Sequence, residues 1–328
     1  MKQYSHFFGV DVSKKTVDIT LAHNAELIHQ QFTNDDEGMA QLMEWLKELK
    51  PAFENTLFCM EATGLYCFPL TRFLAANSID IWIEHAAQIK KSTALARGKN
   101  DKVDSQRIAI YATKYLDRLR LWKPVDTTLE KIKHLASLRD RLVETKKRLE
   151  TPIKEFEEMG NAAMAKLLTK TIKSSLAAID KDLKNVESKI IDIVNEDNNL
   201  KLLYKLITSV VGIGFVTAIN LIVHTNGFTM LKDTRKLACY CGVAPFEYSS
   251  GSSVRGRTKV HFMANKKLKC NLHMASLSAV KLDADLKHYY ERKVAEGKSK
   301  LSVLKEVKNK LLDRIIAVVN KQQEYVKK

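Results

Sequence analysis

Three short β-rich runs near the N-terminus constrain the fold of this chain more than any other feature. The links between them are a few residues long, which is too short for the helix that a parallel crossover requires. The runs therefore predict an antiparallel meander. They cover residues 6–12, 16–22 and 26–33.

The rest of the first 120 residues alternates helical and strand patterns. The combined order, β-β-β-α-β-α-β-α, predicts an α/β domain whose sheet mixes antiparallel and parallel strands. The expected elements are a helix capped by Asn34 or Asp35, a buried strand over 55–61, a helix over 66–76, a buried strand over 78–84, and a helix from about Asp101 to a point before Pro124.

Beyond Pro124 the pattern becomes helical, and we place a domain boundary there. Leu and Ile residues spaced by three and four over 135–149 and 179–193 predict a helical hairpin or coiled coil, broken near Pro152 and Gly160. Such an element would serve as a spacer or for dimerisation, and two amphipathic helices of one domain are the alternative. The expected domains are 1–122, 123–200 and 201–328.

The charge of the chain is high and unevenly placed. Its 54 Lys and Arg exceed its 38 Asp and Glu, which gives a net charge of +16, and the last 78 residues hold +12 of this. A content of only 12 Gly and 5 Pro with 45% hydrophobic residues excludes collagen-like and predominantly disordered chains. A basic globular protein of this kind is expected to bind a polyanion, although charge alone does not separate nucleic acid from an anionic membrane.

The sequence favours an intracellular protein. The N-terminus lacks the apolar core of a signal peptide, so we expect a cytoplasmic protein. The uncharged stretch 206–231 is long enough to span a membrane, but Gly212 and Gly214 interrupt it, and we expect two short buried helices instead. Five cysteines without a CxxC pair are interpreted as reduced packing residues, and Trp45, Trp82 and Trp122 as core residues.

Four acidic residues are candidates for a metal site. Asp11 lies inside an apolar strand and Glu61 ends another. Asp101 and Asp104 share one face at the start of a helix. Taken singly, each acid also has a plain explanation as a solvated carboxylate, a cap or a helix-dipole partner. Together, in this order of elements, they are expected to converge and to repel unless two Mg²⁺ ions, or Mn²⁺, lie between them, as in a ribonuclease H-like nuclease core.

Two further segments are candidates for nucleic-acid chemistry. Gly212 and Gly214 lie between apolar helical segments, as in a helix-hairpin-helix element that binds phosphate through backbone amides. A plain buried turn is the alternative. The segment 241–259 is rich in Ser, Gly and basic residues, which indicates a flexible, anion-attracting loop whose serine is a candidate nucleophile or a simple solvated linker.

These motifs together resemble a known family. In order and spacing they are similar to the DEDD transposases of the bacterial insertion-sequence IS110 family, a group that includes the pilin-gene invertases. The resemblance covers residues 6 to about 320. It rests on Asp11 in GVDVSK, Glu61 in MEATGLY, Asp101 and Asp104 in KNDKVDSQRIA, the GIG turn with TAINLI, and CGVAPFEYSSGSSVRGR.

The resemblance implies a RuvC-like domain of ribonuclease H fold, a coiled-coil linker and a mostly α C-terminal transposase domain. It implies that Asp11, Glu61, Asp101 and Asp104 bind Mg²⁺. Ser250 would be the nucleophile that forms a covalent phosphoserine link to DNA, with Ser249 as the neighbouring alternative. It further implies a homo-oligomer, dimer or tetramer, that recombines donor and target DNA and uses a bridge RNA as guide. One departure from the family pattern is Ala264, where a glycine is expected.

The basic residues after the serine loop are expected to contact phosphates. They are Arg255, Arg257, Lys259, Lys266, Lys267 and Lys269. Three other functions stay open at this point. The same acids with water as nucleophile would make a hydrolytic structure-specific nuclease. An actin-like phosphotransferase would need a second phosphate loop that the sequence lacks. The third is a non-catalytic nucleic-acid binder.

Overall fold

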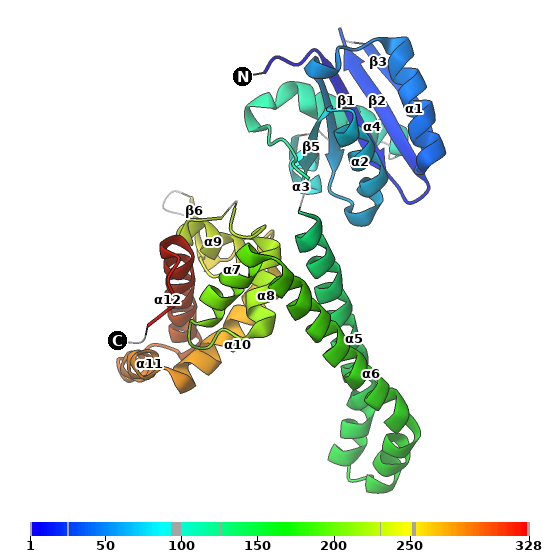
Figure 1. Ribbon diagram of the computed structural model, residues 1–328. Helices are drawn as coiled ribbons and strands as arrows, with labels where there is room; N and C mark the ends of the chain where they lie inside the picture. Colours follow the sequence, from blue (N-terminus) through cyan, green and yellow to red (C-terminus); the bar gives the residue numbers. More distant parts are fainter. Residues whose placement is uncertain are drawn as a thin grey trace. The chain divides into compact units, whose positions relative to one another are not determined.

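The computed structural model describes residues 2–24, 26–92, 100–124, 126–229, 231–250 and 254–326. The chain forms two compact units, residues 1–124 and 125–328, which are described separately below. Figure 1 shows a sheet flanked by helices in the first unit and helices in most of the second. The expected mixed α/β N-terminal part and mostly helical remainder are confirmed.

The first unit is built on a mixed sheet in the order β3-β2-β1-β4-β5. The first three strands pair antiparallel, and β4 and β5 continue the sheet in parallel with β1. The predicted meander is therefore confirmed. The strands are β1 His6–Val12, β2 Thr16–His23, β3 Glu26–Thr33, β4 Thr56–Glu61 and β5 Asp80–Glu84.

Helices cover both faces of this sheet. The apolar side chains Phe8 and Val10 point to the face covered by α1 (Asp36–Leu49) and α2 (Phe68–Ala76), where they form one core with Trp45. The other face packs against α4 (Asp101–Lys114), and α3 (Ala86–Ser92) follows β5. There, Trp82 is buried with residues of α4, whereas Trp122 packs, partly buried, against the first core.

The close approach of α4 to the sheet depends on Gly9. A Cβ at this position would lie 2.0 Å from the backbone nitrogen of Ala109 and 2.3 Å from the carbonyl oxygen of Ser105. The Oγ1 of Thr20 on β2 lies 2.7 Å from the Oγ of Ser105, in a buried hydrogen bond. These contacts hold the start of α4 over the carboxyl ends of β1 and β4.

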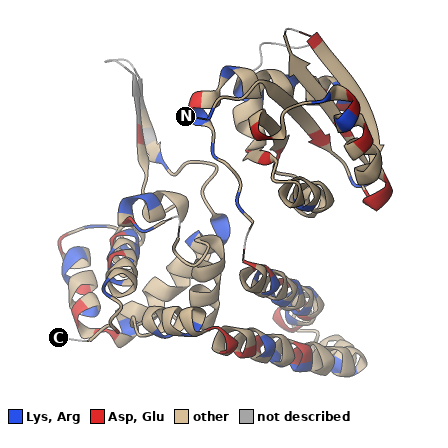
Figure 2. Ribbon diagram, turned by 45° about the horizontal axis from the view of Figure 1, so that its top comes forward, with Lys and Arg blue, Asp and Glu red and all other residues tan. Residues whose placement is uncertain are grey.

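The second unit begins with a long helical hairpin of α5 (Thr127–Glu158) and α6 (Ala162–Glu196). Figure 2 shows basic and acidic residues interleaved along both helices. The chain reverses at Gly160, whose φ is +74°. The expected break near Pro152 is wrong, because α5 continues through this residue. Pro152 and Arg148 are both exposed, so water can bind the carbonyl that the proline leaves without an intrahelical partner.

The remaining helices surround one apolar core. Leu206, Ile222, Leu272 and Leu311 are each at most 1% exposed there. The segment expected as a flexible loop forms a β-hairpin instead, and its strands contain the strand-favouring residues Phe246, Tyr248, Val254 and Thr258. The elements are α7 Asn198–Thr208, α8 Phe215–His224, α9 Thr234–Tyr240, β6 Phe246–Ser250, β7 Val254–Lys259, α10 Lys266–Leu282, α11 Ala284–Ala295 and α12 Lys300–Lys321.

Two further expectations concern the membrane and the cysteines. Within the described ranges, no helix combines the length and apolar character that a bilayer crossing needs. All five cysteines are free thiols, and Cys59, Cys67 and Cys241 are buried as predicted. The packing interpretation is wrong for Cys270, which is exposed.

Candidate functional site

A row of carboxylates crosses the sheet of the first unit. Asp11 on β1 pairs directly with Asp18 on β2. On its other side, the register of β1 with β4 continues to place Asp11 beside Glu61, and Glu61 pairs with Glu84 on β5. Residues directly opposite each other in neighbouring strands share a face, so these acids form one row beneath the start of α4.

The two outer carboxylates of the row have protein partners. Asp18 is 3% exposed, and its oxygens lie 2.9 Å from both His29 Nε2 and Gln31 Nε2. Glu84 accepts a hydrogen bond from the Tyr111 hydroxyl at 3.2 Å. These contacts give the outer acids a structural role.

The two inner carboxylates are different. In the part of the chain that the structure describes, Asp11 and Glu61 have neither a hydrogen-bonding side chain nor an ion-pair partner, and the same holds for Asp101 at the start of α4. Asp104, one turn later, is paired with Arg107 at 2.9 Å. Three of the four predicted carboxylates are thus uncompensated.

The pKa of the Asp11 carboxyl is shifted by burial and by the other acids of the site. Burial, followed by the negative charges of Asp101, Asp104, Glu61 and Asp18, raises the pKa of the Asp11 carboxyl to about 6. The structure therefore brings all four sequence-predicted carboxylates into one electrostatic neighbourhood. Among the described residues, the ion pairs give a cationic partner only to Asp104 of these four acids, through Arg107.

The donor chemistry of this cluster fits a divalent cation. Carboxylate oxygens are the ligands that Mg²⁺ and Mn²⁺ prefer, and the three uncompensated acids are free to bind. Among the described residues, however, no three such side chains already gather around one point as a preformed metal site. Cation binding would therefore require their side chains to turn toward one another.

Sequence reasoning missed Asp18 and Glu84. Both belong to the row, but each lies in a strand with few other distinguishing features. The alternation of inward and outward residues places each on a face of its own strand, whereas their alignment with Asp11 and Glu61 depends on strand order and register. Asp18 was detectable as a charged residue in the otherwise apolar and polar-uncharged run TVDITL.

The two glycines between α7 and α8 have different surroundings. Gly212 has a φ of +94°, and a Cβ there would lie 2.7 Å from the Cβ of Ala279 on α10, so this residue serves packing. Gly214 is the N-cap residue of α8, and a Cβ added to it would have no neighbour within 4 Å among the described atoms. Among the described residues, no side chain accepts a hydrogen bond from the N-terminal amides of α8. These amides are therefore available to a ligand.

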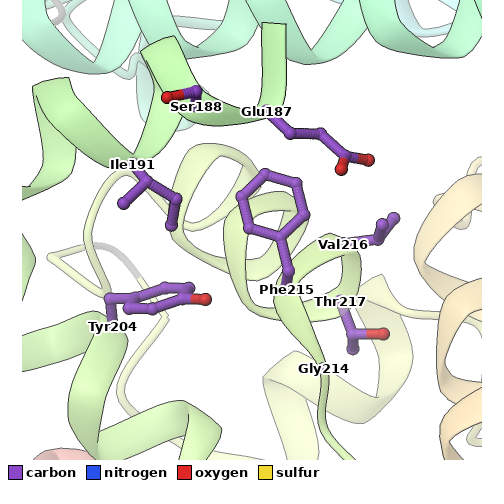
Figure 3. A pocket seen from close by; sticks show the side chains of 8 residues that line it. All are labelled: Glu187, Ser188, Ile191, Tyr204, Gly214, Phe215, Val216 and Thr217. Carbon is purple, nitrogen blue, oxygen red and sulfur yellow. The ribbon is translucent and has the colours of Figure 1, made fainter. Parts of the chain in front are cut away.

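Gly214 borders a cavity of about 560 Å³, shown in Figure 3. The ring of Phe215 lies between Ile191 and Glu187 of α6, and Tyr204 of α7 lies below Ile191 in this view. Glu187 is bound to Arg139 of α5 at 2.6 Å, so its charge is partly compensated. The lining is mostly apolar, and it is completed by Ser188, Val216 and Thr217.

The serine hairpin is described only in its backbone. Ser250 pairs with Val254 and Ser249 with Arg255, next to the tip. Residues 251–253 and the side chains of Ser249, Ser250, Arg255 and Arg257 lie outside the described part. Of the other predicted phosphate contacts, Lys259, Lys266 and Lys269 are exposed, whereas Lys267 forms an ion pair with Asp140 of α5.

Comparisons with known proteins match this chain to transposase family models. The family model of the IS110-type DEDD transposases matches residues 8–156, and that of the transposase IS116/IS110/IS902 family matches residues 204–291. The pilin gene-inverting proteins of Moraxella lacunata and Moraxella bovis are 23% and 24% identical, with 98% of each chain covered. An uncharacterized 43.6 kDa protein of insertion element IS110 from Streptomyces coelicolor is 26% identical over 47% of this chain and 36% of its own.

Proposed function

Because the chain belongs to the IS110 family of transposases, we propose that it is a site-specific DNA recombinase that cuts and rejoins DNA strands at the carboxylate row of its first unit. The observation that carries the proposal is the inner pair Asp11 and Glu61, which has no protein partner in the described residues and lies within electrostatic reach of Asp101 and Asp104. Uncompensated carboxylates at the carboxyl ends of neighbouring strands are suited to binding cations together with a phosphate.

In this proposal Asp11, Glu61, Asp101 and Asp104 hold divalent cations, with Mg²⁺ as the expected ion and Mn²⁺ as a substitute. When bound, the cations would polarise the scissile phosphate and stabilise charge on the leaving oxygen. Asp18 and Glu84 fix the ends of the row through His29 and Tyr111. Arg107 orients Asp104 from one turn along α4.

Ser250 is the proposed nucleophile. Its Oγ forms a bond to phosphorus while the bond from phosphorus to one deoxyribose oxygen breaks, and the serine proton ends on the released sugar hydroxyl. The phosphoserine link conserves the energy of the phosphodiester, so a sugar hydroxyl of another strand can reverse the step and restore Ser250. Ser250 is the last residue of β6, and this position at the end of a hairpin strand supports a reach toward DNA.

The proposed partners are donor and target DNA, a bridge RNA that pairs with both, and further copies of the chain. The excess of positive charge after residue 251 supports a nucleic-acid partner. The two full-length relatives are named for pilin-gene inversion, which supports inversion of a DNA segment as one form of the reaction. The long, charge-interleaved hairpin of α5 and α6 supports an oligomer.

A denaturing gel of protein and labelled DNA tests this function. Supercoiled DNA that carries the flanks of the reading frame is the substrate. The parent protein should give a covalent adduct and recombined product with Mg²⁺. Ser250→Ala should lose both, and Asp11→Asn should lose all strand cutting. Ser249→Ala is the matched control and should keep the adduct.

The hydrolytic nuclease is the second candidate, because the acid row alone would suffice for it. It predicts cutting that Asp11→Asn abolishes and Ser250→Ala leaves intact, without any adduct. Such a result would replace the recombinase proposal by the nuclease.

A further inference from the structure

An exposed apolar turn follows the carboxylate row directly. After Glu61, the chain forms a 3-10 turn over Gly64–Cys67 before α2 begins. Leu65, Tyr66 and Phe68 are 64%, 45% and 41% exposed. Large apolar side chains gathered on the surface beside a functional site indicate a binding surface.

Hydrogen bonds hold this turn against the ends of β1 and β4. The Nδ2 of Asn34 donates to the carbonyl oxygen of Tyr66 and to that of Ser13, each at 2.9 Å. Ser13 is two residues after Asp11. The Sγ of Cys67 lies 3.4 Å from the carbonyl oxygen of Glu61. The turn is thereby tied to the chain segments that carry both inner carboxylates.

Two lysines lie next to the same turn. Lys14 and Lys15 are exposed between β1 and β2, and the backbone amide of Asn34 donates to the carbonyl oxygen of Lys15 at 2.9 Å. The surface at this end of the sheet thus combines apolar side chains, two cations and the carboxylate row. Its occupant should carry negative charge and flat apolar faces.

A DNA strand with unpaired bases has both properties. Its phosphates match the lysines, and its base faces stack on aromatic and aliphatic side chains without regard to sequence. Within a duplex these faces are already covered by neighbouring bases, so the bases must leave the stack to reach the turn. An apolar protein segment would gain little from the lysines.

We propose that Leu65, Tyr66 and Phe68 bind unpaired nucleobases of the DNA strand whose phosphate lies at the carboxylate row. This inference rests on the proposed function, and it specifies the state of the substrate. Bases next to the cut leave the stack on this turn, which gives the phosphate room to enter the row.

Fluorescence anisotropy of two labelled DNAs tests the inference. One is a duplex with a short bubble of unpaired thymines, and the other is the fully paired duplex of the same length. Binding is measured in EDTA with the full-length protein. Tyr66→Ala should weaken binding of the bubble by about fivefold or more and leave that of the paired duplex unchanged. Tyr66→Phe should keep the bubble affinity, because the ring remains.

Ile28→Ala is the matched control. Ile28 is 40% exposed on β3 of the same unit, and its truncation should change neither affinity. The inference would be overturned if Tyr66→Ala weakened binding of both DNAs equally, or if it weakened binding of neither. Weakened self-association or RNA binding with unchanged bubble affinity would assign the turn to a second copy or to RNA instead.

The same measurements keep this inference separate from the proposed function. Asp11→Asn should cut neither DNA when Mg²⁺ is added. Cutting by Asp11→Asn would refute the proposed metal site, whereas the anisotropy result for Tyr66→Ala would still decide the role of the turn.

Discussion

Asp11 and Asp18 lie directly opposite each other on the antiparallel strands β1 and β2, so two carboxylates share one face of the sheet. Like charges in this relationship destabilise a sheet. Asp18 is compensated by His29 and Gln31, whereas Asp11 is not. The uncompensated charge of Asp11 therefore affects both the stability of the protein at neutral pH and its response to divalent cations.

Without divalent cations, Asp11→Asn should stabilise the protein at neutral pH. The native pKa of Asp11, about 6, lies above its usual value of about 3.8, so the native state holds the proton more tightly than the unfolded state. Stability from this group is therefore complete below pH 4 and is lost as the pH rises through about 6. Thermal unfolding in EDTA should show a higher Tm for the variant at pH 7.5 and no such gain at pH 4.

Asp117→Asn provides the control, since the Asp117 side chain is 74% exposed in the same unit. It should leave the Tm unchanged at both pH values. A variant Asp11→Asn that is no more stable than the parent at pH 7.5 would contradict the electrostatic account of the row.

Divalent cations should stabilise the parent and not the site variants. A ligand that binds only the native state at one hundred times its Kd adds about 2.7 kcal/mol of stability. Titration with MnCl₂ or MgCl₂ should raise the parent Tm in steps that follow this relation, and EDTA should reverse the rise. Glu61→Gln and Asp11→Asn should show a much smaller rise in Tm. A rise in both variants equal to that of the parent would place the cation elsewhere.

Gly9→Ala should weaken both the fold and the cation response. Its Cβ would meet the backbone of α4 at 2.0 Å, so the helix must shift and take Asp101 and Asp104 with it. We expect a loss of about 1–3 kcal/mol in urea unfolding and a smaller Mn²⁺-induced rise in Tm. A loss of stability with an unchanged Mn²⁺-induced rise in Tm would show that the position of α4 does not determine cation binding.

Gly212 and Gly214 should respond differently to alanine. Gly212→Ala adds a side chain at a φ of +94° and against Ala279, so it should destabilise the second unit by more than about 1 kcal/mol. Gly214→Ala adds its methyl group to open space and should cost less. Urea unfolding distinguishes them, and equal losses would mean that the Gly212 contact with α10 is easily relieved.

Lys266 and Lys267 form a matched pair for DNA binding. Lys266 is exposed, whereas Lys267 is engaged with Asp140. If the start of α10 contacts phosphates, Lys266→Gln should flatten the dependence of log affinity on log salt by about one unit, and Lys267→Gln should change it less. A reversed order would show that DNA displaces Asp140 from Lys267.

The strands of the first unit and the order of its acids were predictable because both depend on local patterns. Asp11 lies inside one apolar run and Glu61 ends another, and both runs form the strands expected. The row itself was not predictable, since Glu84 joins Glu61 only through a register between strands that are distant in sequence.

Two errors in the second unit have a common cause. The predicted helix break at Pro152 and the predicted loop over 241–259 both rest on residue types that disfavour regular structure. Pro152 is tolerated because its side of α5 faces water. The hairpin forms because its strands pair with each other on both sides of the Ser/Gly tip. In each case the outcome depends on what surrounds the residue, which composition does not report.

The contact at Gly9 also sets the dimensions of the acid cluster. Half of the four predicted carboxylates belong to strands and half to α4, and the spacing between these halves is fixed where bare backbone touches bare backbone. No side chain at this point can shrink, rotate or swell to adjust it. The separation between the β1 backbone and the α4 backbone is therefore a property of the main chain, and substitutions of the carboxylates change the charge of the cluster without changing this separation.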